Sequence, residues 1–579
     1  MLKKNWIVFS LLFFLSFTVG FSIEKNLFKN VIVKTKPKTK NEKRLRLTDV
    51  QIDKAWKGQK GKNVLKIDLG SVQKVNSIRF QVKKDIVFNK IKIKAGETSD
   101  NIALVFEREN GSAVAGEWVL LAGFNIKARY INLVLKSNKN PKIYEIEAFA
   151  VKNDFNGDGF SDFLVSAYTH DAGGTLGADR GRVYVFLGGS TLSTVPVLTL
   201  SGDNFQGYFG ISAAGIGDMN NDGYDDFAIG SSGFDAFITN GGRLDIFLGG
   251  PSLSSTPFVS FFGDENGAFL GISVAGVGDV NSDGFDDFMV GAIGVNQNGT
   301  DQGQAVLYLG SSNLLTSLTT LEFNGDEDFS NFGVRVAGLG DINNDGFDDF
   351  AIGASLHSGG GTDRGRAYIY LGGTTVDSAF DLILNGVSDS SGFGNEIAGV
   401  GDYNRDGFDD FMVTAYLDNV FGLGPDRGRL YGFFGGSSLD LTSDFGFAGG
   451  DNDQLGVSAD GLGDVNNDGW NEYIVGAHLE DAGGNNKGGA HITNSQFTTL
   501  DFNGIENEEF FGVSVVGLGD VNNDGYNDFM VGASGKDSGG TDRGAVLIYL
   551  GRETVLSLPT IPLTALIGDE DSDGFGANL

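Results

Sequence analysis

The chain contains no cysteine among its 579 residues. A disulfide framework, a cysteine nucleophile and a cysteine-linked lipid anchor are therefore excluded. Histidine is also scarce, with four copies, and neither a G-x-S-x-G nor an H-E-x-x-H motif occurs. These absences predict that the protein is not an enzyme.

Proline is rare, with 8 copies, whereas glycine reaches 89, about twice its ordinary share. The glycines do not form linkers, because they recur at fixed places in a repeat. Each repeat contains an acidic loop of pattern D-x-N-x-D-G-aromatic-x-D, with Glu472 in place of the last aspartate in the sixth. The seven loops begin at Asp154, Asp218, Asp279, Asp341, Asp402, Asp464 and Asp520, with spacings of 64, 61, 62, 61, 62 and 56 residues. Such a period predicts a repeat architecture.

The side chains of each acidic loop suit a calcium ion. Positions 1, 3, 5 and 9 carry carboxylate or amide oxygens, and position 7 offers its carbonyl, which matches the oxygen ligands that Ca²⁺ prefers. Glycine at position 6 permits the bend, and the aromatic side chain at position 7 stays free to enter the core. The predicted ligands of up to seven Ca²⁺ ions are Asp154, Asn156, Asp158, Phe160, Asp162, Asp218, Asn220, Asp222, Tyr224, Asp226, Asp279, Asn281, Asp283, Phe285, Asp287, Asp341, Asn343, Asp345, Phe347, Asp349, Asp402, Asn404, Asp406, Phe408, Asp410, Asp464, Asn466, Asp468, Trp470, Glu472, Asp520, Asn522, Asp524, Tyr526 and Asp528.

Two alternatives explain the loops less well. An Asx-rich turn without metal would hold three or four acidic or amide groups together, and clustered carboxylates repel one another without a cation. An EF-hand needs a bidentate glutamate at its twelfth position, where this chain has Val165, Ile229 and Val290. Those residues lie in β-like runs, so we expect each loop to join two strands.

Residues 1–22 have the pattern of a secretory signal peptide. Lys3 and Lys4 form a basic n-region, and an apolar h-region runs from Trp6 to Phe21. If it is not cleaved, this segment is at the lower length limit for a membrane anchor, about 17 residues. We therefore expect a secreted or cell-surface protein, and the cysteine-free, lysine- and asparagine-rich sequence favours a bacterial source.

Charge divides the chain. Residues 1–152 hold 30 basic and 13 acidic residues, a net charge of +17, whereas residues 153–579 hold 13 and 62, a net charge of −49. An acidic body of this kind argues against nucleic acid as a partner. Residues 23–44 are predicted to form a basic linker.

Each repeat has the course of four short strands. In the second repeat these are expected over 211–217, 227–230, 243–250 and 258–262, with the acidic loop between the first two. Four strands in each of seven repeats predict an all-β, seven-bladed β-propeller over residues 151–579.

Two further motifs keep register with the acidic loop. A Phe-Gly pair precedes it at Phe209-Gly210, Phe332-Gly333, Phe393-Gly394, Phe511-Gly512 and Phe575-Gly576, altered to Phe269-Leu270-Gly271 and Leu455-Gly456. A Gly-Ala pair follows it at Gly291-Ala292, Gly353-Ala354, Gly476-Ala477 and Gly532-Ala533. Together these motifs resemble the FG-GAP repeats of integrin α subunits, without the proline. The resemblance implies a calcium-binding propeller with ligands on the face opposite the acidic loops.

The motif count predicts how the ring closes. The first acidic loop has no Phe-Gly before it, and the last Phe-Gly, at Phe575-Gly576, has no acidic loop after it. We therefore expect the C-terminal segment to complete the first blade. The alternative is a chain cut inside an eighth repeat.

Residues 45–150 show period-2 alternation and no acidic loop, which predicts a small β-sandwich of the jelly-roll type. The runs at 67–70, 128–131 and 145–149 resemble discoidin, or galactose-binding-like, domains. The resemblance implies possible binding of sugars or lipid head groups, although Trp56 and Trp118 fit a packing role better than sugar stacking.

The opposite face of the ring carries the other two kinds of loop. The sequence predicts that the loops after the fourth strands are rich in Asp and Glu, and that the loops after the second strands end in Asp-Arg-Gly. We expect arginines such as Arg364 and Arg543 to pair locally with neighbouring acids. His170 and His357 occupy equivalent positions in different repeats, so we expect no joint site.

The sequence therefore predicts a secreted, calcium-binding adhesion or ligand-binding protein whose partner is an extracellular protein or glycan. Two alternatives stay open. One is a secreted polysaccharide-acting hydrolase or lyase that uses the acidic face, and the other is a structural cell-surface component.

Overall fold

The computed structural model describes residues 153–579 apart from 172–177, 237, 297–298, 313–318, 420–423, 467, 469, 482–483, 495–498, 538–539 and 553–560. Before residue 153 it gives strand bounds and pairing only. The predicted signal peptide and basic linker therefore lie outside the described residues. The chain divides into two compact units, the first made mainly of Met1–Val151 and the second of the remaining residues up to Leu579.

In the part of the first unit for which strand bounds are given, there are thirteen strands. They are β1 (Ser16–Phe17), β2 (Gly20–Phe21), β3 (Asn30–Ile32), β4 (Thr35–Lys36), β5 (Arg44–Leu45), β6 (Val50–Lys57), β7 (Gly61–Val75), β8 (Ser77–Val82), β9 (Ile86–Thr98), β10 (Asn101–Ala113), β11 (Trp118–Leu121), β12 (Ile126–Ser137) and β13 (Lys142–Phe149). The larger sheets have the orders β10-β9-β12-β7-β3 and β11-β8-β13-β6. The β-sandwich predicted for residues 45–150 depends on side-chain packing, which lies outside the described residues.

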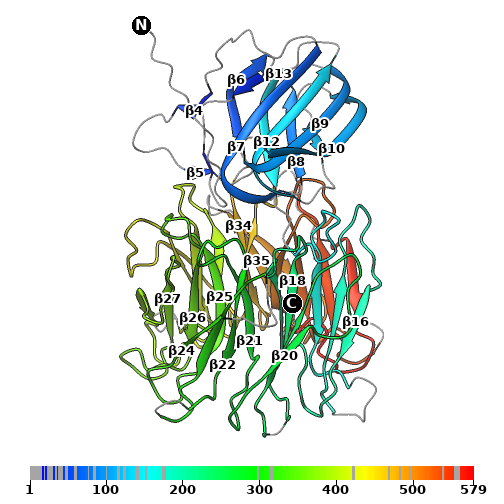
Figure 1. Cartoon of the computed structure of the whole chain (residues 1–579). Helices are drawn as coiled ribbons and strands as arrows, with labels where there is room; N and C mark the ends of the chain where they lie inside the picture. Colours follow the sequence, from blue (N-terminus) through cyan, green and yellow to red (C-terminus); the bar gives the residue numbers. More distant parts are fainter. Residues whose placement is uncertain are drawn as a thin grey trace. The chain divides into compact units, whose positions relative to one another are not determined.

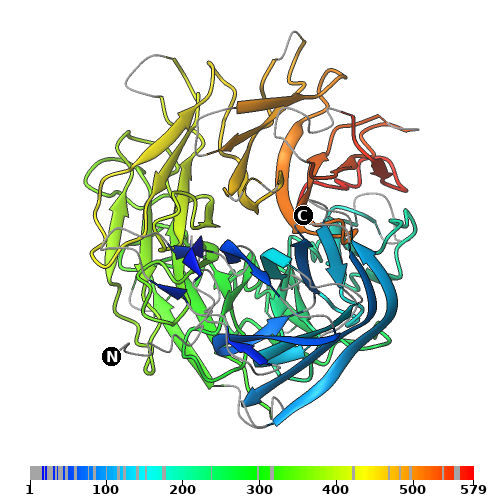
Figure 2. The same cartoon turned by 90° about the horizontal axis from the view of Figure 1, so that it is seen from above.

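The second unit is a ring of seven small antiparallel sheets (Figure 1), and Figure 2 shows them following one another from cyan to red. The first blade has three strands, β14 (Phe163–Ala167), β15 (Arg182–Phe186) and β16 (Leu198–Ser201). The other six blades have four strands each, in chain order. The seven-bladed, all-β propeller predicted from the repeat is therefore confirmed.

The strands of blades two to seven have the following bounds. Blade two has β17 (Ser212–Gly217), β18 (Asp226–Ser231), β19 (Arg243–Phe247) and β20 (Val259–Phe262), and blade three has β21 (Ser273–Gly278), β22 (Asp287–Ala292), β23 (Gln304–Leu309) and β24 (Thr319–Asn324). Blade four has β25 (Phe332–Gly340), β26 (Asp349–Ala354), β27 (Arg366–Tyr370) and β28 (Leu382–Asn385), and blade five has β29 (Ile397–Gly401), β30 (Asp410–Ala415), β31 (Arg429–Phe433) and β32 (Phe445–Ala448). Blade six has β33 (Ala459–Gly463), β34 (Glu472–Ala477), β35 (Gly489–Asn494) and β36 (Thr499–Asn503), and blade seven has β37 (Phe511–Gly519), β38 (Asp528–Ala533), β39 (Ala545–Tyr549) and β40 (Thr564–Ile567).

The hydrophobic core lies between neighbouring blades. The strand that follows each acidic loop is the second strand of its blade, and β14 takes this place in blade one. Every residue of this strand is buried in all seven blades. The reason is that each such strand has a neighbouring strand on either side and a neighbouring blade on either face. In blade two, the rings of Phe227 and Phe247 stack with their centroids 5.0 Å apart. Apolar clusters such as the one that joins Ile216 and Leu244 to Phe288 and Val290 combine side chains of two adjacent blades.

The C-terminal residues complete the first blade. Asn578 forms an antiparallel bridge with Ser166 of β14. The Ser166 N–H donates to the Asn578 carbonyl at 3.3 Å, and the Gly576 N–H donates to the Ser166 carbonyl at 3.0 Å. The closure expected from the motif count is therefore confirmed.

The order of the strands sets two faces on the ring. The acidic loops and the loops between third and fourth strands lie on one face, here called the acidic-loop face. The loops after the second and fourth strands lie on the opposite face. No helix within the described residues has the length and apolar character needed to cross a membrane.

Candidate metal sites

Each acidic loop is held between the first and second strands of its blade. In blade two, β17 ends at Gly217 and β18 begins at Asp226, the position-9 residue. Position 6 is Gly223, whose φ of 100° lies in the left-handed region that glycine adopts without a steric penalty. The bend that the sequence predicts at position 6 is therefore present.

The oxygen atoms of positions 1, 3 and 5 converge on the inside of the loop. Asp218 accepts the N–H groups of Asp222 at 2.9 Å and Gly223 at 2.9 Å through its two oxygens. The Asn220 side-chain oxygen accepts the Asp222 N–H at 2.8 Å, and Asp222 accepts the Tyr224 N–H at 3.0 Å. The same pattern recurs in loops one, three, four and seven.

The position-9 carboxylate is completely buried in all seven loops. Asp226 is completely buried, and its oxygens accept the N–H groups of Met219 at 3.2 Å and Gly249 at 2.8 Å. Burial, and then the charges of Asp218 and Asp222, raise the pKa of Asp226 to about 8. Asp162, Asp287 and Asp349 have pKa values raised to about 8, also mainly by burial.

This arrangement fits a divalent cation with oxygen ligands. Three carboxylates of one loop lie close enough to raise the pKa of the deepest one, so a bound cation would remove their mutual repulsion. The donor set contains carboxylate and amide oxygens, which suit Ca²⁺. Each loop could therefore hold one Ca²⁺ through positions 1, 3, 5, 7 and 9.

Loop six differs from the others. Glu472 replaces the aspartate at position 9 and accepts the Asn466 side-chain N–H at 3.0 Å, together with the Val465 N–H at 3.1 Å. The longer side chain therefore reaches the position-3 amide directly. The structure thus distinguishes loop six from the six loops with aspartate.

The prediction that the position-7 aromatic side chain enters the core is wrong. All seven of these residues are only half-buried, and the Tyr224 ring lies against Gly157 of the preceding loop. The apolar or aromatic residue that is buried in every loop is at position 2, namely Phe155, Met219, Val280, Ile342, Tyr403, Val465 and Val521. Position 2 points inward because its own N–H bonds the buried position-9 carboxylate.

The residue at position 8, which the loop pattern leaves unspecified, connects neighbouring loops. Asp225 accepts the N–H of Asp154 at 2.7 Å, and its own N–H donates to the Asp154 carbonyl at 3.0 Å. The position-8 aspartates of loops three, four and five likewise accept the position-1 N–H of the preceding loop at 2.7, 2.9 and 3.1 Å. Each of these loops is thereby tied to the loop of the blade before it. The available signal was an Asp or Asn at position 8 in every loop except the first, which has Ser161.

The position-8 side chain also explains a fixed glycine. A Cβ on Gly278 would meet an Asp348 oxygen at 2.1 Å, and one on Gly340 would meet an Asp409 oxygen at 2.4 Å. Burial raises the pKa of Asp348 to about 8 and also raises the pKa of Asp409. The glycine before each of these position-1 aspartates therefore makes room for the carboxylate of the next blade.

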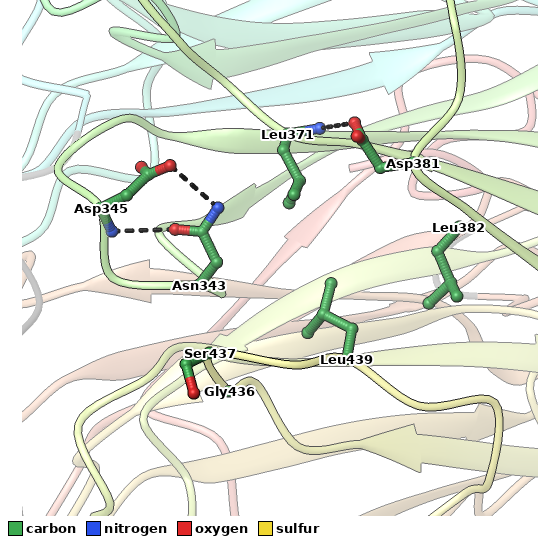
Figure 3. Close-up of a pocket in the computed structure, with 8 residues that line it drawn as sticks. All are labelled: Asn343, Asp345, Leu371, Asp381, Leu382, Gly436, Ser437 and Leu439. Atoms are coloured by element: carbon green, nitrogen blue, oxygen red, sulfur yellow. Dashed lines mark hydrogen bonds between the residues drawn. The ribbon is translucent and has the colours of Figure 1, made fainter.

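A pocket of about 440 Å³ opens beside loop four. Figure 3 shows Asn343 and Asp345, two of its predicted ligands, on one side and Leu382 and Leu439 on another. Asp381 accepts the Leu371 N–H at 2.8 Å and fixes the rim. Two predicted calcium ligands thus border an open, partly apolar pocket between blades four and five.

The opposite face combines a constant backbone with variable side chains. In all seven blades the glycine of the loop after the second strand donates its N–H to the carbonyl of one equivalent residue. That residue is His170, Phe234, Val295, His357, Asp418, Glu480 or Lys536. The same backbone bond therefore holds six different residue types at seven equivalent positions, with histidine occurring twice.

Three of the four arginines in the Asp-Arg-Gly sequences pair with local acids, as expected, whereas the Nε of Arg180 is buried without a hydrogen-bond partner among the described residues. Arg364 lies 2.6 Å from Asp389, Arg427 lies 2.6 Å from Asp451, and Arg543 lies 2.8 Å from Asp571. The two equivalent histidines do not share a site, because His170 contacts Asp569 and His357 contacts Asp326. Both expectations about this face are confirmed.

Comparison with known proteins agrees with these repeats. The family model described as FG-GAP repeat matches residues 148–186, 209–247, 332–370 and 511–549. Integrin alpha-5 of Xenopus laevis is 29% identical over 294 residues, which cover 50% of this chain and 21% of the integrin. Integrin alpha-V of Gallus gallus is 31% identical over 41% of this chain and 22% of its own length. Integrin alpha-8 of Mus musculus is 35% identical over 28% of this chain and 16% of its own length.

The matched segments span about a fifth of the length of these curated relatives. Among solved structures, the match to chitosan-binding module 1 of a Paenibacillus chitosanase/glucanase covers 17% of this chain and 76% of the module, with 16% identity and a TM-score of 0.15. That score is too low to support a statement about fold. The FG-GAP matches and the seven blades together show that this chain contains an integrin-α-like FG-GAP β-propeller.

Proposed function

We propose that this protein is a secreted or cell-surface adhesion protein that binds an extracellular protein or glycan through the opposite face of its propeller. The proposal rests on the observation that the residues at equivalent positions of this face differ between blades and that the face exposes apolar side chains. Phe205, Phe329, Val387 and Ile505 are 57%, 57%, 55% and 74% exposed, and all four lie in loops after fourth strands. Exposed apolar side chains among polar ones are typical of protein-binding surfaces.

In this proposal the acidic loops bind up to seven Ca²⁺ ions and make the ring a rigid support. The resemblance to integrin α subunits and the oxygen-rich loops support this role. Residues 1–22 would act as the signal peptide, and membrane attachment would occur only if that segment is not cleaved. Residues 45–150 would form the discoidin-like β-sandwich, with the basic linker before it.

The test is binding of the full chain to an array of matrix proteins and glycans in millimolar Ca²⁺, compared with the double variant Phe329→Ser, Ile505→Ser. We expect at least a tenfold loss of affinity, because buried apolar anchors dominate binding. The matched control is Val195→Ser, which removes a 71% exposed side chain from the acidic-loop face and should leave binding unchanged.

If the double variant bound normally and the Val195 variant lost affinity, recognition would lie on the acidic-loop face and the proposal would be wrong. Release of product from a bound glycan would favour the polysaccharide-acting enzyme. Self-assembly without a foreign ligand would favour the structural surface component.

A further inference from the structure

A buried histidine lies where the ring closes. His170, completely buried, follows β14 in blade one. It contacts the segment after β40, 399 residues further along the chain. Its Nε2 lies 2.9 Å from Asp569, and its Nδ1 lies 3.4 Å from Glu570. Both ring nitrogens therefore face carboxylates of the closing segment.

Asp573 supplies a third carboxylate close to the same histidine. One ligand atom each from His170, Asp569 and Asp573 lie within 4.8 Å of one another. Asp573 is 1% exposed and accepts the N–H groups of Phe575 at 2.8 Å and Glu570 at 3.3 Å. The backbone of the closing segment thus fixes this carboxylate beside the imidazole.

The cluster carries more negative than positive charge. Arg182 lies 2.8 Å from Asp569, and the Tyr184 hydroxyl donates to Asp569 at 2.8 Å. The cluster contains three carboxylates, those of Asp569, Glu570 and Asp573. The cations in contact with them are Arg182 and, when protonated, His170. Burial raises the pKa of Asp573 to about 6, as expected for a carboxylate without a full counter-charge.

Blade four contains a natural control. His357 occupies the position equivalent to His170 and lies 3.1 Å from Asp326 and 3.2 Å from Glu327. Its Nδ1 accepts the Gly359 N–H at 2.9 Å, so its Nε2 carries the proton that is donated to the acids. The equivalent of Asp573 is Ser330, whose hydroxyl donates to the Gln302 carbonyl at 3.1 Å. This blade keeps the histidine and two acids but lacks the third carboxylate.

We propose that His170, Asp569 and Asp573 bind one divalent transition-metal ion of the Zn²⁺ type at the closure of the ring. An imidazole nitrogen with two carboxylates suits such an ion, whereas the acidic loops offer only oxygen and suit Ca²⁺. Glu570 would accept the Nδ1–H and orient the imidazole, as carboxylates do for metal-bound histidines. The ion would link blade one to the C-terminal segment and stabilise the closed ring.

The test uses the full chain saturated with Ca²⁺ and then titrated with Zn²⁺ in a calorimeter, with the melting temperature followed in parallel. We expect one Zn²⁺ per chain in the tightest class and a higher melting temperature. His170→Gln and Asp573→Ser should each weaken that class at least tenfold and abolish the thermal shift. His357→Gln should change neither quantity.

If His170→Gln does not fold, Asp573→Ser decides alone, because serine is already accommodated at the equivalent position in blade four. Equal Zn²⁺ affinity in Asp573→Ser and the parent would overturn the proposal and indicate an adventitious ion only. The same conclusion would follow if His357→Gln lost as much affinity as Asp573→Ser.

Discussion

The two faces of the propeller use repetition differently. On the acidic-loop face, every blade keeps a carboxylate or amide side chain at positions 1, 3, 5 and 9, and the position-9 carboxylate is buried in all seven blades. On the opposite face, every blade keeps one backbone bond but changes the side chain, from His170 to Phe234 to Lys536. Repeated side chains serve a task common to all blades, which is holding the ring together. Varied side chains on a constant backbone allow recognition without changing the fold.

The largest expected effect is a pH dependence that arises mainly from buried carboxyls on the acidic-loop face. Without metal, the pKa values of Asp162, Asp226, Asp287 and Asp349 are raised from 3.8 to about 8. The folded state then holds protons that the unfolded chain releases. The free energy of unfolding should fall as the pH rises from about 4 to about 8, by up to about 1.4 kcal/mol per pH unit for each carboxyl.

Melting in chelator at about pH 6 and about pH 8 measures this effect. We expect the higher melting temperature at the lower pH, and we expect saturating Ca²⁺ to abolish the difference. Identical chelated melts at the two pH values would contradict this reading of the acidic loops.

Opening the ring should have the next largest effect. Deletion of residues 576–579 removes the Gly576 N–H and Asn578 carbonyl bonds to Ser166 and the bond from the Ser514 hydroxyl to Gly576. We expect a loss of about 4 kcal/mol from these bonds and the packing of Leu579, measured by urea unfolding. Asn578→Ala keeps the backbone bonds and is the control. A deletion variant as stable as the control would show that closure contributes little.

A pair of alanine variants compares the faces directly. Asp226→Ala leaves the N–H groups of Met219 and Gly249 without their acceptor and should cost about 3 kcal/mol. Asp264→Ala changes an exposed aspartate of the opposite face and should alter stability by less than about 0.5 kcal/mol. Similar losses in both variants would remove the distinction between the faces.

The link between acidic loops should give a smaller effect. Asp225→Ala removes the acceptor of the buried Asp154 N–H and should cost about 2 kcal/mol. Asp225→Asn retains a side-chain oxygen and should recover more than half of that loss. An alanine variant no less stable than the asparagine variant would argue against a linking role.

The smallest expected effect is a gain. Among the described residues, the buried Tyr403 hydroxyl has no hydrogen-bond partner, while its ring packs 4.8 Å from Phe445. Tyr403→Phe should raise the free energy of unfolding by about 1 kcal/mol, because it removes an unsatisfied polar group. Tyr431→Phe loses a bond to Asp418 and should lower stability by a similar amount. A loss in the Tyr403 variant would mean that its hydroxyl is satisfied.

The blade count, the strand order and the closure could be predicted because they depend on motif spacing alone. Positions 2, 7 and 8 could not be resolved in the same way. Inside one loop, nothing in the sequence says whether Met219 or Tyr224 faces the core, since both are large and apolar. That choice follows from the bond between the Met219 N–H and Asp226. The partner of Asp225 lies 71 residues away, so only the ring brings the two together.

The cluster at His170 illustrates the same limit. Its histidine and Asp569 are separated by 399 residues, and the spacing of neither residue suggests a shared site. Their contact depends on the C-terminal segment returning to blade one. Side chains that meet only through closure are therefore the part of the site that local sequence patterns predict least well.

The most direct test of the account is the number of Ca²⁺ ions bound by the full chain, measured by native mass spectrometry across a Ca²⁺ titration. The account predicts up to seven ions that chelator removes, filling at about 10⁻⁴–10⁻³ M Ca²⁺, with a parallel rise in melting temperature. A chain that binds no Ca²⁺ and melts at the same temperature in Ca²⁺ and in chelator would contradict it.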